Sequence, residues 1–194
     1  MLSAKIEKLD NEFDNLLSFD FQKISNAHWT PTDVALMTAK WLGENPKSEV
    51  LDVGSGVGKF CVIGATVSNA HFTGVELRKN LFEEAKLIQQ KKGIKNITFL
   101  NENITSIDLG KFNAFYYYNP FGEHVAVAGW IDKSITFSEK TFNDYEGYFY
   151  KHLSGKQIGT RVATYFSPNF YLPDSYYAAE ILFDGNLIFW EKIK

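Results

Sequence analysis

The segment LDVGSGVGKF, residues 51–60, places three glycines at alternate positions behind Asp52. Glycine has no side chain, so such a loop lets its backbone approach a ligand closely. A triphosphate-binding loop needs a glycine five positions before the Gly58-Lys59 pair and a serine or threonine after it. Val53 and Phe60 stand at those two positions, so the segment does not match a triphosphate-binding loop.

The same segment also departs from the dinucleotide fingerprint G-x-G-x-x-G, because Lys59 stands where the third glycine belongs. Asp52 would lie near an approaching pyrophosphate and repel it. A cofactor that carries a cationic group and no phosphate suits this loop better.

LDVGSGVGKF resembles the cofactor-binding motif of the class I S-adenosylmethionine-dependent methyltransferases, an acidic residue followed by G-x-G-x-G. S-adenosylmethionine carries a sulfonium, an ammonium and a carboxylate. The resemblance implies that Asp52 receives the ammonium and that Ser55 adds a donor near the carboxylate. It also implies that the glycines at positions Gly54, Gly56 and Gly58 let the backbone approach the methionine and ribose portions.

Two later positions extend the resemblance. GVELR ends a predicted strand and places Glu76 22 residues beyond Gly54 (76 − 54), where the family's acidic residue accepts the ribose hydroxyls. Leu77 would then pack on the adenine face. After the next strand, spacing indicates Asn103 as the residue that contacts the adenine amine, with Glu102 as the competing candidate.

Asn119, Pro120 and Phe121 follow the fourth predicted strand, at an edge where open α/β sheets collect ligands. They resemble the (N/D)-P-P-(Y/F) motif of amino-group methyltransferases, with one proline in place of two. The resemblance implies that Asn119 borders the cofactor and accepts the N–H groups of the methyl acceptor, while Phe121 stacks on a planar substrate or on the sulfonium. The alternative is a turn that ends a buried strand.

Residues 50–122 also partly resemble the non-SET histone-lysine methyltransferases, which implies lysine as an acceptor by analogy only. Glu123 and His124 follow Phe121 and could accept a proton, although an ordinary surface role also explains His124.

The pattern of elements predicts an α/β fold that positions these residues. Strands at 49–54, 71–77, 96–101 and 112–118 alternate with helices at 58–68 and 80–92, which indicates βαβ units and a parallel sheet. A helix at 138–153, a strand at 157–166 and a hairpin around Asp184-Gly185-Asn186 follow. Helices are expected at 2–20 and from Pro31 to Gly43, the second with Thr30 as its N-cap.

We therefore expect a Rossmann-like three-layer α/β/α sandwich whose mostly parallel, seven-stranded sheet is closed by a C-terminal antiparallel hairpin. The chain is expected to form a single methyltransferase domain over 1–194, with N-terminal helices in 1–45 and the Rossmann-like core in 46–194.

Composition indicates the partners and the compartment. The net charge is −3, which disfavours bulk nucleic acid, so we expect a small-molecule or protein acceptor. Cys61 is the only cysteine, which excludes an internal disulfide, and we expect no metal site. The first 17 residues carry charges that exclude a secretory signal, and no apolar run is long enough for a membrane span, so a cytoplasmic location is expected. The oligomeric state stays open.

The sequence thus predicts an S-adenosylmethionine-dependent methyltransferase whose acceptor is nitrogen rather than oxygen. Two alternatives stay open: an NAD(P)-dependent oxidoreductase, and a module that binds S-adenosylmethionine without turnover.

Overall fold

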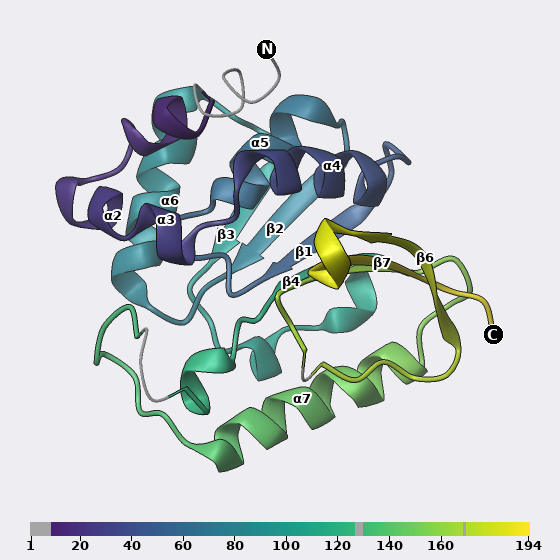
Figure 1. Ribbon diagram of the computed structural model, residues 1–194. Helices are drawn as coiled ribbons and strands as arrows, with labels where there is room; N and C mark the ends of the chain where they lie inside the picture. The colour runs from purple at the N-terminus through teal and green to yellow at the C-terminus, as the bar shows by residue number, and fades with distance from the viewer. Residues whose placement is uncertain (1–8, 127–129, 169) are drawn as a thin grey trace.

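A computed structural model describes residues 9–126, 130–168 and 170–194. Within these ranges, seven strands form one sheet between helical layers (Figure 1). The strands are β1 (Glu49–Val53), β2 (His71–Val75), β3 (Ile97–Leu100), β4 (Ala114–Tyr118), β5 (Arg161–Tyr165), β6 (Tyr176–Leu182) and β7 (Leu187–Lys192). Their order is β3-β2-β1-β4-β5-β7-β6, with β1 to β5 parallel and β7 antiparallel to both of its neighbours. The predicted fold class is confirmed.

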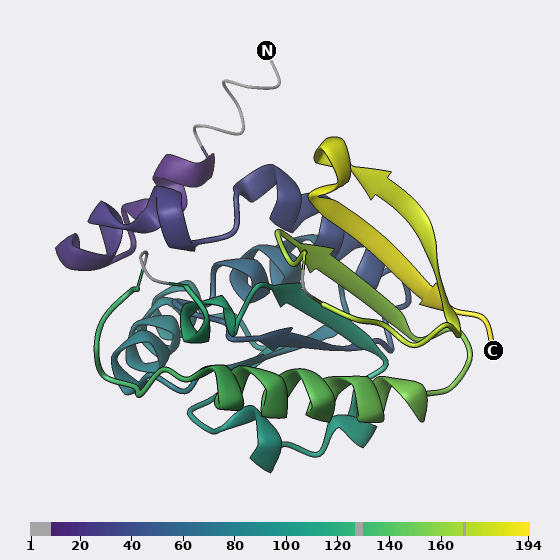
Figure 2. The ribbon, with the colours of Figure 1, turned by 60° about the horizontal axis from the view of Figure 1, so that its bottom comes forward.

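Helices cover both faces of the sheet (Figure 2). One layer contains α4 (Thr32–Leu42), α5 (Lys59–Val67) and α6 (Lys79–Lys92), and the other contains α7 (Glu139–Ser154) with the turns η1 (Ile104–Ser106) and η2 (Leu109–Lys111). The short elements are α2 (Phe19–Lys23), α3 (Ser25–His28), η3 (Gly122–His124) and η4 (Phe183–Gly185). Val50 packs into the first core and Leu51 into the second, so β1 is covered on both of its faces.

The N-terminal segment differs from the predicted helix over 2–20. Residues 9–14 are helical, and residues 2–8 lie outside the described ranges. The chain then turns, and the backbone N–H of Ser18 donates to Glu84 Oε1 on α6 at 2.5 Å. A tertiary contact therefore ends the helix where the apolar pattern predicts that it continues.

The start of α4 is also not the predicted one. The Thr30 hydroxyl lies 3.0 Å from the Tyr116 hydroxyl instead of capping the helix. The N–H of Thr32 donates to Asp10 Oδ1 at 3.1 Å, so a carboxylate from the N-terminal segment satisfies a free donor of the first turn. That distant cap was not predictable from local sequence.

The parallel strands bring five loops to one edge of the sheet. The carboxyl ends of β1 to β5 lead into the glycine loop, Glu76, Asn103, Asn119 and Phe166. None of the helices that the structure describes combines the length and the apolar character needed to cross a bilayer.

Candidate active site

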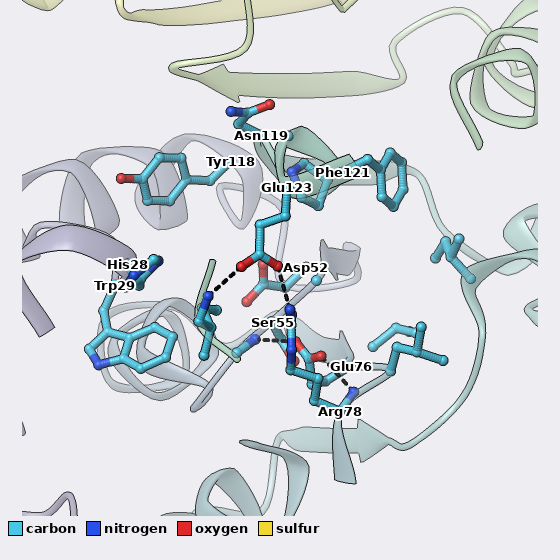
Figure 3. A pocket seen from close by; sticks show the side chains of 18 of the residues that line it. His28, Trp29, Asp52, Ser55, Glu76, Arg78, Tyr118, Asn119, Phe121 and Glu123 are labelled. Carbon is cyan, nitrogen blue, oxygen red and sulfur yellow. Dashed lines mark hydrogen bonds and ion pairs between the residues drawn. The ribbon is translucent and has the colours of Figure 1, made fainter. Parts of the chain in front are cut away.

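A cavity of about 440 Å³ opens at this edge, between the strand ends and the loops that follow α3 and β4. It is lined by the glycine loop, Glu76 and Leu77, Glu102 and Asn103, and the segment around Asn119. In the view of Figure 3, Asn119 and Phe121 lie at the top, Glu76 and Arg78 at the bottom, and Asp52 and Glu123 between them. Apart from Gly58, which faces Phe99 on β3, the structure brings the predicted site residues to one cavity.

The glycine loop is built for close approach. Gly54, Gly56 and Gly58 have φ of 70°, 54° and 78°, in the region that glycine adopts readily. A Cβ on Gly54 would lie 2.8 Å from Pro120 Cβ, so this glycine lets the loop after β4 close against the loop after β1. The two motifs singled out in the sequence are therefore packed against each other.

Asp52 presents a buried carboxylate to the cavity. Its side chain is 4% exposed, and the Cys61 thiol donates to Oδ2 at 3.4 Å. Burial raises the pKa of Asp52 to about 7; the thiol hydrogen bond opposes this shift and the charge of Glu76 adds to it. Within the part of the chain that the structure describes, no lysine, arginine or histidine forms an ion pair with this carboxylate. A cationic ligand group would compensate it.

Ser55 supplies a hydroxyl without a hydrogen-bond partner to the same cavity. Its hydroxyl is buried, lines the cavity and has no hydrogen-bond partner among the described residues. Buried hydroxyls without partners are rare because their desolvation costs about 1–3 kcal/mol. Ser55 and Asp52 therefore fit a ligand that carries both a cationic group and an acceptor.

Glu76 follows β2, and its carboxylate is held in place by backbone donors. Oε2 accepts the N–H of Gly56 at 2.9 Å and Oε1 accepts the N–H of Arg78 at 2.8 Å. Burial raises the pKa of Glu76 in spite of these hydrogen bonds. Each oxygen keeps a further lone pair, so the carboxylate can still accept from a pair of hydroxyls. Leu77, 41% exposed, lines the cavity beside it.

Asn103 is engaged in local structure. Its Oδ1 accepts the N–H and the hydroxyl of Thr105 at 3.0 and 2.8 Å and so caps η1, while Nδ2 donates to the Tyr145 hydroxyl at 2.8 Å. Both lone pairs of the oxygen are used. The exposed carboxylate of Glu102 lines the same rim, so this geometry favours Glu102 over Asn103 for an adenine amine.

The loop after β4 exposes Asn119 and buries Phe121. Asn119 has φ of 38°, and its side-chain amide forms no hydrogen bond with another described residue. The amide lies over Gly122, where an added Cβ would be 2.4 Å from Asn119 Nδ2. Phe121 is 6% exposed, and its ring packs against Tyr145 with the centroids 4.7 Å apart.

Arg78 is a part of the site that the motifs did not indicate. It is 7% exposed and contacts Glu123 Oε2 at 2.5 Å and Asp132 Oδ1 at 3.1 Å. Although burial raises the pKa of Asp132, hydrogen bonds from Ser134 and Arg78 lower it to about 2. Arg78 thus ties the segment after Phe121 to the end of β2, and Glu123 is not a free base.

A family model described as a methyltransferase domain matches residues 44–143. The chain belongs to this family. The family match and the seven-stranded sheet confirm the resemblance to class I S-adenosylmethionine-dependent methyltransferases. The family match also confirms the predicted cofactor of the family, S-adenosyl-L-methionine, and sets aside the oxidoreductase alternative. A search of curated protein sequences finds no match.

Solved methyltransferase structures share the fold at low identity. TrmN from Thermus thermophilus is 18% identical, with a TM-score of 0.65 over 89% of this chain and 52% of that one. An RNA methyltransferase from Salinibacter ruber, crystallised with S-adenosyl-L-homocysteine, is 16% identical, with a TM-score of 0.58 over 84% and 92%. The tRNA (m1A58) methyltransferase TrmI from Aquifex aeolicus is 18% identical, with a TM-score of 0.55 over 84% and 69%. The chain spans about half the length of TrmN.

These comparisons contradict the expectation that bulk nucleic acid is disfavoured and that a small molecule or a protein is the acceptor. A tRNA methyltransferase and an RNA methyltransferase are among the solved structures that share this fold. The net charge of −3 is an average over the whole chain. Recognition of RNA depends on local groups and on aromatic faces that stack with exposed bases, which total charge does not report.

Proposed function

We propose that the chain is an S-adenosylmethionine-dependent methyltransferase that acts on a nitrogen atom of an RNA base. The observation that carries the cofactor site is the presence in one cavity of the buried Asp52 carboxylate, which forms no ion pair with a described residue, and the buried Ser55 hydroxyl, which has no hydrogen-bond partner among the described residues. The cytoplasmic location expected from the sequence remains part of this proposal.

The residues present fit S-adenosylmethionine from one end to the other. Asp52 would receive its ammonium, Ser55 would donate to its carboxylate, and the free lone pairs of Glu76 would accept its ribose hydroxyls. Leu77 would pack on the adenine, and Glu102 would accept the adenine amine. When bound, this cofactor supplies an electrophilic methyl group, which an acceptor nitrogen takes by in-line displacement.

Asn119 would hold the acceptor. Its unpartnered amide oxygen can accept an N–H group and so aim the nitrogen lone pair into the cavity. Gly54 allows Pro120 to press against the glycine loop, which keeps Asn119 close to the cofactor-binding segment. An RNA base is the proposed acceptor because bases carry planar N–H groups and because RNA methyltransferases share the fold.

Two histidines are placed to take the proton that the acceptor loses. His28 and His124 both line the cavity, and burial lowers the pKa of each, so both imidazoles are neutral at pH 7. The backbone N–H of Ser138 donates to His124 Nδ1 at 3.2 Å, which leaves Nε2 as the protonated nitrogen of the neutral ring. No described hydrogen bond fixes the tautomer of His28, so its neutral ring can present either nitrogen as the proton acceptor.

Transfer of a labelled methyl group tests the proposal. The purified chain is incubated with methyl-tritiated S-adenosylmethionine and with unmodified tRNA and rRNA transcripts, and the RNA is then digested to nucleosides. We expect the label in an N-methylated nucleoside. Label in a carbon- or oxygen-methylated nucleoside would contradict the nitrogen acceptor. Binding of S-adenosylhomocysteine without any RNA labelling would leave the module without turnover as the better description.

A further inference from the structure

The part of the cavity beside Asn119 is where the acceptor base would bind, and an aromatic ring there would stack on the base. Phe121 exposes only 6% of its surface. Besides Tyr145, its ring packs edge-on against Tyr117 with the centroids 5.7 Å apart, and Phe149 lies at 6.0 Å. These rings belong to the core between the sheet and α7. Only a small part of the Phe121 ring is therefore available to a substrate.

Phe166 lines the same cavity and is 47% exposed. It follows β5 directly, as Asn119 follows β4, and the register of the two strands pairs Tyr118 with Tyr165. Asn119 and Phe166 thus occupy the next position on two adjacent strands. The register of the sheet therefore brings both residues to the same edge of the cavity, where the Phe166 ring packs edge-on against Tyr165 with the centroids 4.7 Å apart.

Both residues adopt an unusual backbone conformation. Asn119 has φ of 38° and Phe166 has φ of 45°, in the left-handed region that bulky side chains rarely adopt. Such residues persist only where the surrounding structure holds them, and they cluster at functional sites. The other two described non-glycine residues with positive φ, Phe183 and Asp184, lie in the turn of the β6–β7 hairpin.

Ser167 holds this arrangement in place. Its hydroxyl accepts the N–H of Asn119 at 2.9 Å, and the same oxygen lies 2.9 Å from the carbonyl of Tyr165 and 3.2 Å from that of Tyr117. The N–H of Phe166 donates to the carbonyl of Asn186 at 2.9 Å. Hydrogen bonds that involve β4, β5 and the turn before β7 therefore hold the backbone of Asn119 and Phe166 in place before any substrate arrives.

We infer that Phe166 is the stacking face for the acceptor base, beside the amide of Asn119 that accepts its N–H group. This assignment rests on the proposed function and names the group that recognises the substrate. A neutral planar base suits this end of the cavity, because its amide and its ring are uncharged. Glu123 is committed to Arg78 and to the N–H of Ile131, which leaves it unable to balance a lysine ammonium.

Binding of RNA to Phe166 variants tests the inference. Phe166→Gly removes the ring and suits the positive φ, so loss of folding does not confound it, whereas Phe166→Trp keeps an aromatic face. Phe183→Gly is the matched control, since Phe183 has φ of 50°, is 41% exposed and does not line the cavity. A fluorescein-labelled, unmodified tRNA transcript is titrated by anisotropy in the presence of saturating S-adenosylhomocysteine, whose own affinity is measured by calorimetry.

We expect Phe166→Gly to weaken tRNA binding by roughly 5- to 150-fold, the range for loss of one base–aromatic stack. The Trp variant and the Phe183 control should stay near the wild type, and all variants should bind S-adenosylhomocysteine equally. Unchanged tRNA binding in Phe166→Gly would overturn the stacking role alone. A lysine-rich peptide that binds in place of tRNA, and is lost in Phe166→Gly, would overturn the base as ligand. Failure of the wild type to bind S-adenosylhomocysteine would instead overturn the proposed function.

Discussion

Replacing Asp52 with asparagine should stabilise the unliganded protein while it weakens cofactor binding. The carboxylate is 4% exposed and forms no ion pair with a described residue, so the folded state holds it at a cost. An asparagine has almost the same shape and carries no charge. Asp52→Asn therefore removes the free-energy cost of burying a charged carboxylate, and it also removes the group that would receive the cofactor ammonium.

The magnitude follows from the pKa. Burial raises the pKa of Asp52 from 3.8 to about 7, and the difference of about 3 corresponds to about 4 kcal/mol. Between these two pKa values the folded state binds more protons than the unfolded state, so the free energy of unfolding falls as pH rises. About 2.5 kcal/mol of this cost should develop between pH 5 and pH 8.

Urea unfolding of the wild type and of Asp52→Asn at pH 5 and pH 8 measures this difference. The stability advantage of the variant should be about 2.5 kcal/mol larger at pH 8, because other titrating groups are common to both proteins. Asp20→Asn, at a carboxylate 88% exposed, is the matched control and should change stability equally at both pH values. Saturating S-adenosylhomocysteine should then stabilise the wild type far more than Asp52→Asn.

A variant advantage that is the same at pH 5 and pH 8 would refute the assignment of a costly buried carboxylate. Equal stabilisation of the two proteins by S-adenosylhomocysteine would refute the role of Asp52 as the ammonium acceptor.

Two glycine substitutions test the positions that the packing requires. Gly122→Ala should lower kcat for methyl transfer by about tenfold or more, because its Cβ would lie 2.4 Å from the amide nitrogen of Asn119. The affinity for S-adenosylhomocysteine should not change, and Gly147→Ala, with no atom within 4 Å of its Cβ, should keep full activity. Gly58→Ala should lower the free energy of unfolding in urea by about 1–3 kcal/mol more than Gly159→Ala. Both glycines have positive φ, but only at Gly58 would the added Cβ clash with a neighbour, the Phe99 ring on β3. Equal losses of stability in Gly58→Ala and Gly159→Ala would show that backbone strain alone explains the effect. An unchanged kcat in Gly122→Ala would contradict the placement of the Asn119 amide.

Much of the fold was predictable because its signals are local. The apolar run that becomes β1, the glycines after it and the hairpin around Asp184 each depend on neighbouring residues. The break at Ser18 and the cap that Asp10 supplies to α4 depend on contacts across 66 and 22 positions of the sequence. Such contacts leave no periodic pattern.

The site residues likewise fall into those that a local motif indicates and those that only the folded chain brings together. Asp52 and Glu76 were predictable because a motif marks the end of each strand, and the structure brings both to one cavity. Arg78 stood in the GVELR segment, but its ion pairs with Glu123 and Asp132 form only once the fold is complete. Phe166 had no motif at all. Its place beside Asn119 follows from the register of β4 and β5, which the sequence does not specify.

Calorimetric titration of the purified chain with S-adenosylhomocysteine, with NAD as the parallel ligand, tests the central claim most directly. Binding of S-adenosylhomocysteine at micromolar concentrations and none of NAD is the predicted result. Binding of NAD alone, or of neither ligand, would contradict the assignment of this cavity to S-adenosylmethionine.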